Sequence, residues 1–161
     1  MKVYIKNQQR LIKVNRQKTA RLLRKALNLL QLPRAEISIL FVNNRRMRVL
    51  NCDYRGVDRT TDVLSFPLYS AEELKAEVKK PSHVCTSDMQ ILPDLLPLGD
   101  IVINLQKAKQ QALENRLSFD DELKRLIIHG LLHLLGYDHE QGKDADRRMQ
   151  RKSRALFEML Q

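Results

Sequence analysis

The chain has 161 residues, of which 43% are hydrophobic and 30% are charged, and its formal net charge is +10. This length predicts one domain with a substantial core. No apolar run is long enough to span a membrane, and the two widely separated cysteines, Cys52 and Cys85, favour a reducing compartment over a disulfide scaffold. We therefore expect a single domain over residues 1–161 in the cytoplasm, and we exclude the membrane-spanning and disulfide-rich secreted classes.

The positive charge is concentrated at the start of the chain. Residues 1–35 hold ten basic side chains and no acidic one, whereas the rest of the chain holds 19 of each sign. Such a localised positive field favours a polyanion, above all RNA or DNA. A solvated basic helix face explains the charge equally well, and an organelle transit peptide explains it less well because the segment has no serine. The predicted RNA-binding residues are Arg16, Arg21, Arg24 and Lys25.

The first part of the chain predicts extended segments at 3–5 and 11–14, followed by a helix over 16–30. In that helix the apolar residues recur at helical spacing with most basic residues opposite, so it packs one side and exposes the other. A buried strand is predicted at 37–42, and a short helix at 45–52 follows a turn.

The second part predicts strands at 61–67 and 98–105, a helix at 106–116 and a basic last helix at 143–160. Residues 68–97 are expected to be an inserted loop with room for a short charged helix, and connections of this length are usually functional or mobile. The pattern predicts an α+β domain, with one mixed sheet of about four strands packed with about five helices.

Three of the four histidines, His129, His133 and His139, lie within eleven residues. Residues four apart share one face of a helix, so the first two imidazoles can reach the same metal ion. Gly136 can adopt the left-handed conformation that ends a helix, which allows the chain to bring His139 back as a third ligand. Because three nitrogen ligands with an open fourth position are typical of catalytic zinc, we predict one Zn²⁺ per chain.

The helix that carries these histidines is expected to begin at a capping box formed by Ser118 and Asp121. It is apolar nearly all round, which predicts a buried core helix with the metal site at its end. Imidazoles on such a helix would be desolvated, and a metal ion is one good way to satisfy them. His83 lies in a polar loop and is not predicted to be a ligand.

The general base is not identified by the sequence. The histidine spacing equals that of metzincin metallopeptidases, but Gly130 stands where those enzymes have their glutamate base. Asp138, Asp62 and Asp100 are carboxylates that can equally orient a ligand or hold structure. Three hypotheses therefore stand: a nuclease, a metallopeptidase, and a non-catalytic, metal-containing RNA-binding factor of ribosome assembly.

Four motifs resemble the YbeY family of bacterial and organellar endoribonucleases, and together they span most of the chain. They are Tyr54-Arg55-Gly56 with Asp58, Thr61-Asp62-Val63-Leu64-Ser65-Phe66-Pro67, Leu98-Gly99-Asp100-Ile101, and the block from His129 to His139. The resemblance implies a cytoplasmic, metal-dependent endoribonuclease with an α+β fold, specific for single-stranded RNA. Such an enzyme acts in ribosome quality control and in ribosomal RNA maturation, notably at the 3′ end of the small-subunit RNA.

The resemblance also implies the roles of individual residues. The zinc ligands would be His129, His133 and His139, and Arg55 would be the catalytic arginine, although from the residues alone a surface salt bridge is the better account of Arg55. The implied partners are single-stranded ribosomal RNA and the small ribosomal subunit, with no membrane. Two departures from the family pattern are a longer loop at 68–97 and an unusually basic last helix.

Overall fold

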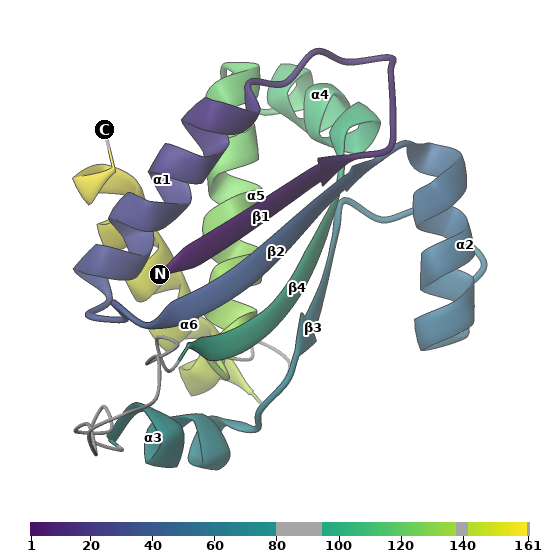
Figure 1. The fold of residues 1–161 in the computed structure, drawn as a ribbon. Coiled ribbons are helices and arrows are strands. Elements are labelled where there is room, and N and C mark those ends of the chain that lie inside the picture. Colours follow the sequence, from purple (N-terminus) through teal and green to yellow (C-terminus); the bar gives the residue numbers. More distant parts are fainter. Residues whose placement is uncertain (80–94, 138–141, 161) are drawn as a thin grey trace, which may run out of the picture.

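One mixed sheet of four strands runs through the part of the chain that this computed structural model describes, residues 1–79, 95–137 and 142–160 (Figure 1). The strands are β1 (Lys2–Asn7), β2 (Ala35–Val42), β3 (Val63–Pro67) and β4 (Leu96–Asn104). The helices are α1 (Arg16–Leu29), α2 (Asn44–Arg55), α3 (Ala71–Lys79), α4 (Leu105–Glu114), α5 (Phe119–Leu134) and α6 (Lys143–Met159). The strand order is β1-β2-β4-β3, in which β1, β2 and β4 are parallel and β3 runs antiparallel to β4.

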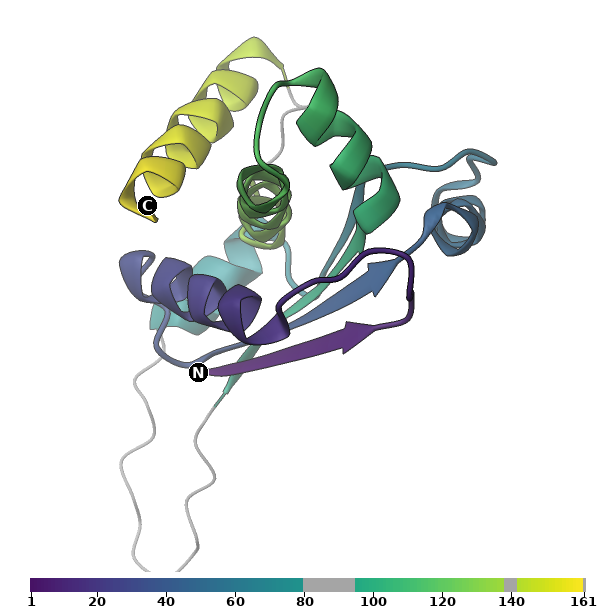
Figure 2. The ribbon, with the colours of Figure 1, turned by 90° about the horizontal axis from the view of Figure 1, so that it is seen from above.

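Alternation along the strands divides the apolar residues between two faces of the sheet. On one face Ile39 of β2 and Ile101 of β4 are paired and fully buried beneath the main group of helices. Figure 2 shows α5 end-on in the middle of that group, with α1, α4 and α6 around it. On the other face Leu64 and Val102 pack with Met47 of α2. The sheet is therefore covered on both sides, with α5 as the central helix of the thicker layer.

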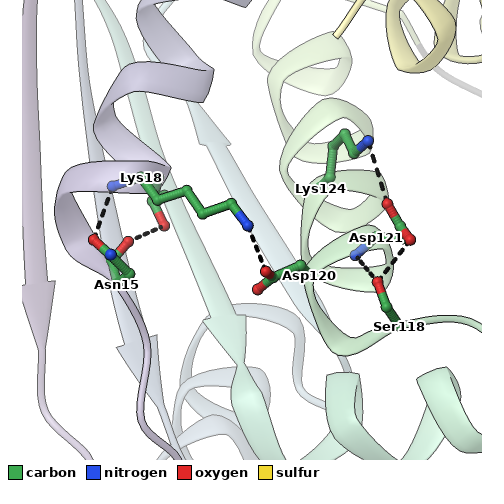
Figure 3. A network of polar contacts seen from close by, with 7 residues as sticks. Asn15, Lys18, Ser118, Asp120, Asp121 and Lys124 are labelled. Atoms are coloured by element: carbon green, nitrogen blue, oxygen red, sulfur yellow. Dashed lines mark hydrogen bonds and ion pairs between the residues drawn. The ribbon is translucent and has the colours of Figure 1, made fainter. Parts of the chain in front are cut away.

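Side-chain caps begin both α1 and α5, and one ion pair joins the two helices near these ends (Figure 3). Asn15 accepts a hydrogen bond from the backbone N–H of Lys18 at 2.9 Å, and Ser118 accepts one from the N–H of Asp121 at 3.0 Å. The Lys18 ammonium lies 2.5 Å from the Asp120 carboxylate. The predicted cap at Ser118 is confirmed, and each cap satisfies an N–H that the helix itself leaves unpaired.

The predicted α+β fold is confirmed, and the short charged helix anticipated within 68–97 forms as α3 (Ala71–Lys79). There are two local differences, of which the first is that β4 already begins at Leu96, two residues before the predicted strand. The extended segment predicted at 11–14 is wrong, because Gln9 holds the backbone of Ile12 in a loop. The Gln9 side chain accepts from the Ile12 N–H and donates to the Ile12 carbonyl, both at 2.8 Å, so these groups are satisfied without a neighbouring strand. None of the described helices combines the length and apolarity needed to cross a bilayer.

Candidate metal-binding active site

His129 and His133 converge on one point at the side of α5. Their Nε2 atoms lie 3.1 Å apart, and their rings are nearly perpendicular, with an interplanar angle of 80°. Both imidazoles are half-buried, and they lie one turn apart, as the four-residue spacing predicts. Nitrogen ligands at about 2.0–2.1 Å from a tetrahedral zinc ion would be roughly 3.3 Å apart. The two imidazoles therefore fit one zinc ion.

The third predicted ligand, His139, lies outside the described residues, together with Asp138, His83 and Cys85. Over residues 1–79, 95–137 and 142–160, no group of three histidine, cysteine or acidic side chains converges as a metal site. The structure thus brings two of the three predicted ligands together, and the role of His139 stays a prediction.

The end of α5 has the backbone geometry predicted for Gly136. Its φ is +81°, in the left-handed region, and its N–H donates to the carbonyl of His133 at 3.0 Å. The next N–H, that of Tyr137, donates to the carbonyl of Leu132 at 3.0 Å, which completes a Schellman motif. A Cβ at position 136 would lie 2.6 Å from the Cβ of Ala71, so glycine also allows α3 to approach this turn. The turn therefore fixes the direction in which the chain leaves His133.

Gly130 lies between the two histidines in sequence, but it faces the sheet and not the point where the imidazoles converge. A Cβ there would lie 2.8 Å from Cγ2 of Ile101 and 3.2 Å from the hydroxyl oxygen of Ser65. The Ser65 hydroxyl also donates to the Gly130 carbonyl at 3.3 Å. The absence of a glutamate base at this position therefore has a packing reason: α5 lies so close to β3 and β4 that even a methyl group at position 130 would force Ile101 to shift.

A cleft of about 620 Å³ contains both histidines and the predicted catalytic arginine. Its walls come from the end of α2, the segment through β3, the start of α3 and the end of α5. Among its lining residues are Arg55, Asp62, Ser65, Glu72, His129 and His133. Segments more than 70 residues apart in sequence thus meet at one hollow, which is lined by both the Arg55 side chain and the two imidazoles.

Arg55 is the last residue of α2, which extends past the predicted 45–52 because Gly56 ends it in the left-handed conformation with a φ of +67°. Tyr54 packs edge-on against Phe66 of β3 at a centroid distance of 5.0 Å. The loop that follows is tied back to α2, because Arg48 binds both carboxylate oxygens of Asp58 at 2.6 Å. The hydrogen bond from Arg48 lowers the pKa of Asp58. These contacts hold the end of α2 beside β3.

Asp62 lines the cleft, and its partly buried carboxylate accepts three hydrogen bonds from the protein. Its oxygens accept from the Gln111 amide at 3.0 Å, the Val63 N–H at 2.9 Å and the Thr61 hydroxyl at 3.1 Å. Burial acts to raise the pKa of Asp62, but these hydrogen bonds outweigh it and the pKa is lowered. Asp62 is therefore held as a carboxylate, tied to α4 through Gln111.

Two other groups of predicted residues lie elsewhere. Asp100 accepts a hydrogen bond from Ser38 of the adjacent strand, on the face opposite to Ile101 and hence opposite to α5. The four predicted RNA-binding residues are exposed on α1, and no α1 residue lines the histidine cleft. A role for α1 in binding RNA is untested by this geometry and remains a prediction.

Asn104 supports the cleft and was not singled out from the sequence. It is fully buried, and its amide donates to the side chains of Asn44 and Thr60 at 2.7 and 2.9 Å and to the carbonyl of Thr61 at 3.1 Å. Its side-chain oxygen accepts from backbone N–H groups in the first turn of α4. The signal in the sequence was an asparagine between a predicted strand and a predicted helix, which is typical of an N-cap.

Comparison with known proteins agrees with this architecture. The sequence model of the family Endoribonuclease YbeY matches residues 4–161. The Endoribonuclease YbeY of Caldanaerobacter subterraneus subsp. tengcongensis is 42% identical over 125 residues, which is 78% of this chain and 73% of that protein. That of Geobacillus thermodenitrificans is 50% identical over 107 residues, which is 66% of this chain but only 61% of its own length.

A solved structure shows the same fold. The solution structure of TM1509 from Thermotoga maritima superposes with a TM-score of 0.63 at 24% identity, covering 98% of this chain and 88% of that one. At this identity the likeness concerns the fold alone. The match of the family model across nearly the whole sequence shows that the chain belongs to the YbeY family of endoribonucleases.

Proposed function

We propose that this protein is a zinc-dependent endoribonuclease that cleaves single-stranded RNA in the cleft beside α5. The observation that carries the proposal is the convergence of His129 and His133, with Nε2 atoms 3.1 Å apart, in the same cleft as Arg55. Membership of the YbeY family supports a nuclease in a metal-dependent family. Zinc, one ion per chain, and His139 as the third ligand are the finer parts of the proposal.

The proposed substrate is ribosomal RNA, at the 3′ end of the small-subunit RNA, and the proposed place of action is the small ribosomal subunit in the cytoplasm. Family membership and the net charge of +10 support an RNA substrate. The basic residues of α1 are proposed as RNA contacts away from the cleft, since a polyanion bound at the cleft can extend over neighbouring positive surface.

In this proposal each residue of the cleft has a distinct task. Zinc bound here would supply a Lewis acid for a phosphoryl oxygen and would lower the pKa of a bound water toward neutrality. His129 and His133 hold the ion with neutral imidazoles. Arg55 holds the scissile phosphate, because its planar guanidinium stays charged and matches two phosphate oxygens.

Asp62 is proposed as a positioning residue and not as the general base. An effective base at neutral pH has a pKa near the working pH, whereas hydrogen bonds lower the pKa of Asp62 despite its burial. The carboxylate instead fixes the entrance to β3 by its bonds to Gln111 and Val63.

The packing of Gly130 weighs against the metallopeptidase hypothesis. A glutamate after the first histidine would have to displace Ile101 or Ser65, whose atoms lie 2.8 and 3.2 Å from a Cβ at this position. The base that such peptidases use would therefore disturb the packing of α5 against the sheet at this position.

The test combines metal analysis with cleavage assays. Bound metal is measured by mass spectrometry, and cleavage of single-stranded RNA, double-stranded RNA and casein is followed with and without chelator. We expect wild type to carry zinc and to cut only single-stranded RNA, His133→Ala to lose both metal and cleavage, and Arg55→Ala to keep metal but cleave about 100-fold more slowly.

Arg45→Ala is the matched control, because Arg45 is an exposed arginine at the other end of α2 and does not line the cleft. It should cleave like wild type. Full activity in metal-depleted protein would refute the zinc mechanism, and RNA binding without any cleavage would favour the assembly-factor hypothesis.

A further inference from the structure

A second hollow adjoins the histidine cleft, between α5 and α6. This α5–α6 groove has a volume of about 720 Å³, and it shares His129 and Asp62 with the cleft. Its floor is apolar, formed by Leu126, Met149 and Phe157. A nucleobase could therefore lie on the floor directly beside the metal-binding face of α5, since bases stack or pack on apolar and aromatic side chains.

The walls of the α5–α6 groove are charged but nearly neutral in sum. Arg125 lies one turn before His129 and binds the fully buried carboxylate of Glu122 through Nη2 at 2.6 Å and through Nε at 3.1 Å. Its Nη1 has no hydrogen bond within the described residues. Arg154 pairs with Glu158 at 3.4 Å, and Asp146 accepts from a glutamine one turn along. The groove thus suits an uncharged base better than a phosphate.

Positive charge appears where the groove opens onto α6. Arg147, Arg151 and Arg154 lie at i, i+4 and i+7, on one stripe of the helix, and Arg148 lies beside them. Asp144 is the one acidic side chain that lines this surface. Arg154 belongs to both the groove and the stripe. Cleft, groove and arginine stripe therefore follow one another without a break.

The arginines of the stripe are available to an incoming anion. Arg147 approaches Asp144 only at 4.0 Å, and both side chains are at least three-quarters exposed. Arg148 and Arg151 have no ion pair within the described residues. The buried residues of α6 are Met149 and Leu156, whereas the four arginines are exposed, so packing on the core does not explain them. Charge complementarity favours a chain of phosphates.

We propose that single-stranded RNA bound at the histidines crosses the α5–α6 groove and continues along the arginine stripe of α6. The proposal rests on the proposed function for the chemistry in the cleft. It adds the path by which the strand leaves the cleft, along the α5–α6 groove and the arginine stripe, which we call the track. It also adds the residues that hold the phosphates of the strand.

The experiment compares two RNA lengths with Arg147→Gln/Arg151→Gln. Oligonucleotides of about four and about twelve nucleotides represent the cleft alone and the cleft plus track. Binding is measured by fluorescence anisotropy, and cleavage gives kcat and KM. Two lost phosphate contacts with a single-strand slope of about 0.7 each should weaken binding of the long RNA by roughly 25-fold at 0.1 M salt and reduce the salt slope by about 1.4. The short RNA should bind and react as with wild type.

The matched control is Arg45→Gln/Arg46→Gln, which removes the same charge from exposed positions on α2 that line neither hollow nor stripe. Equal losses in the control and in the α6 variant would overturn the track. A loss that appears only in Arg21→Gln/Arg24→Gln would place the strand on α1 and also overturn it. If wild type binds the long RNA through the stripe but cleaves nothing, the track stands and the proposed function fails. If wild type cleaves and the α6 variant binds and cleaves RNA of both lengths like wild type, the proposed function stands and the track fails.

Discussion

The substitution Gly130→Ala tests whether close contact between α5 and the sheet shapes this site. In an ordinary helix interior this change stabilises a protein by about 0.5–1 kcal/mol, because glycine loses more backbone freedom on folding than alanine. Here the new methyl group would lie 2.8 Å from Cγ2 and 3.2 Å from Cδ1 of Ile101, and 3.2 Å from the Ser65 oxygen. We therefore expect the opposite sign.

The magnitude follows from the gap that has to open. Carbon atoms pack at about 3.5–4.0 Å, so the methyl group and Ile101 must separate by roughly 0.7–1.2 Å. Ile101 is fully buried and stiff at χ1, so it cannot turn away at little cost. Overpacking of this kind costs about 1–3 kcal/mol. After subtraction of the helix gain, we expect a net loss of about 1 kcal/mol and a fall in Tm of about 2–4 °C.

Urea unfolding followed by circular dichroism measures this loss, and Ile101→Ala provides the partner for a double-mutant cycle. Without the isoleucine branch the added methyl group has space, so Gly130→Ala should be neutral or stabilising in that background, with a coupling of about 1–3 kcal/mol. A gain in stability for Gly130→Ala alone, of the size seen in solvent-exposed helices, would refute the reasoning. So would an equal effect in both backgrounds.

Three further outcomes are expected. Asp62→Asn should lower stability above pH about 4, and its difference from wild type should shrink as the pH falls below that value. The reason is that the pKa of Asp62 is lowered in the folded state, so its stabilisation is lost as the pH falls through the folded value. A difference that stays constant in urea melts over the acid range would contradict this. Asn104→Ala should lower the free energy of unfolding by about 2–4 kcal/mol, since it removes the cap of α4 and the three hydrogen bonds that the buried Asn104 amide donates. A loss below about 1 kcal/mol in urea unfolding would contradict this role of Asn104. Gly136→Ala should lower Tm more than Gly56→Ala. Both glycines have a positive φ, but only a Cβ at position 136 would clash with Ala71. Equal shifts in Tm by calorimetry would show that this contact is unimportant.

Most of the fold could be predicted from local patterns. The helices and strands follow from periodicity, and the cap at Ser118 follows from its hydroxyl and the acidic residue three positions later. The failure at 11–14 has a clear cause: an apolar run predicts a strand only if its backbone has no closer partner, and Gln9 supplies one. Nothing in residue spacing reports that a side chain will take both groups of Ile12.

The sequence predicted which residues belong to the site better than it predicted how they are arranged. The four-residue spacing predicted the convergence of His129 and His133, and the left-handed turn at Gly136 followed from glycine's freedom. The sequence could not place Arg55 in the same cleft, because that depends on how far α2 extends and on how its end packs against β3. The hydrogen bonds donated by the buried amide of Asn104 could not be predicted either, since their acceptors come from two segments far from it in the sequence, Asn44 and Thr60–Thr61.

Gly130 links the packing of the core to the position of the metal ligands. The histidines lie on either side of it in the sequence, and Ser65, which contacts it, lines the same cleft. A displacement of α5 by about 1 Å would therefore change the position of the imidazoles relative to Arg55, and misplacement of that size can lower a rate by about 100-fold. Ser118→Ala, which removes the cap at the far end of α5, should cost about 1 kcal/mol as well but leave the helix against the sheet. At equal loss of stability, then, only the change at Gly130 should abolish most of the cleavage while metal stays bound, because only that change alters the distance between helix and sheet.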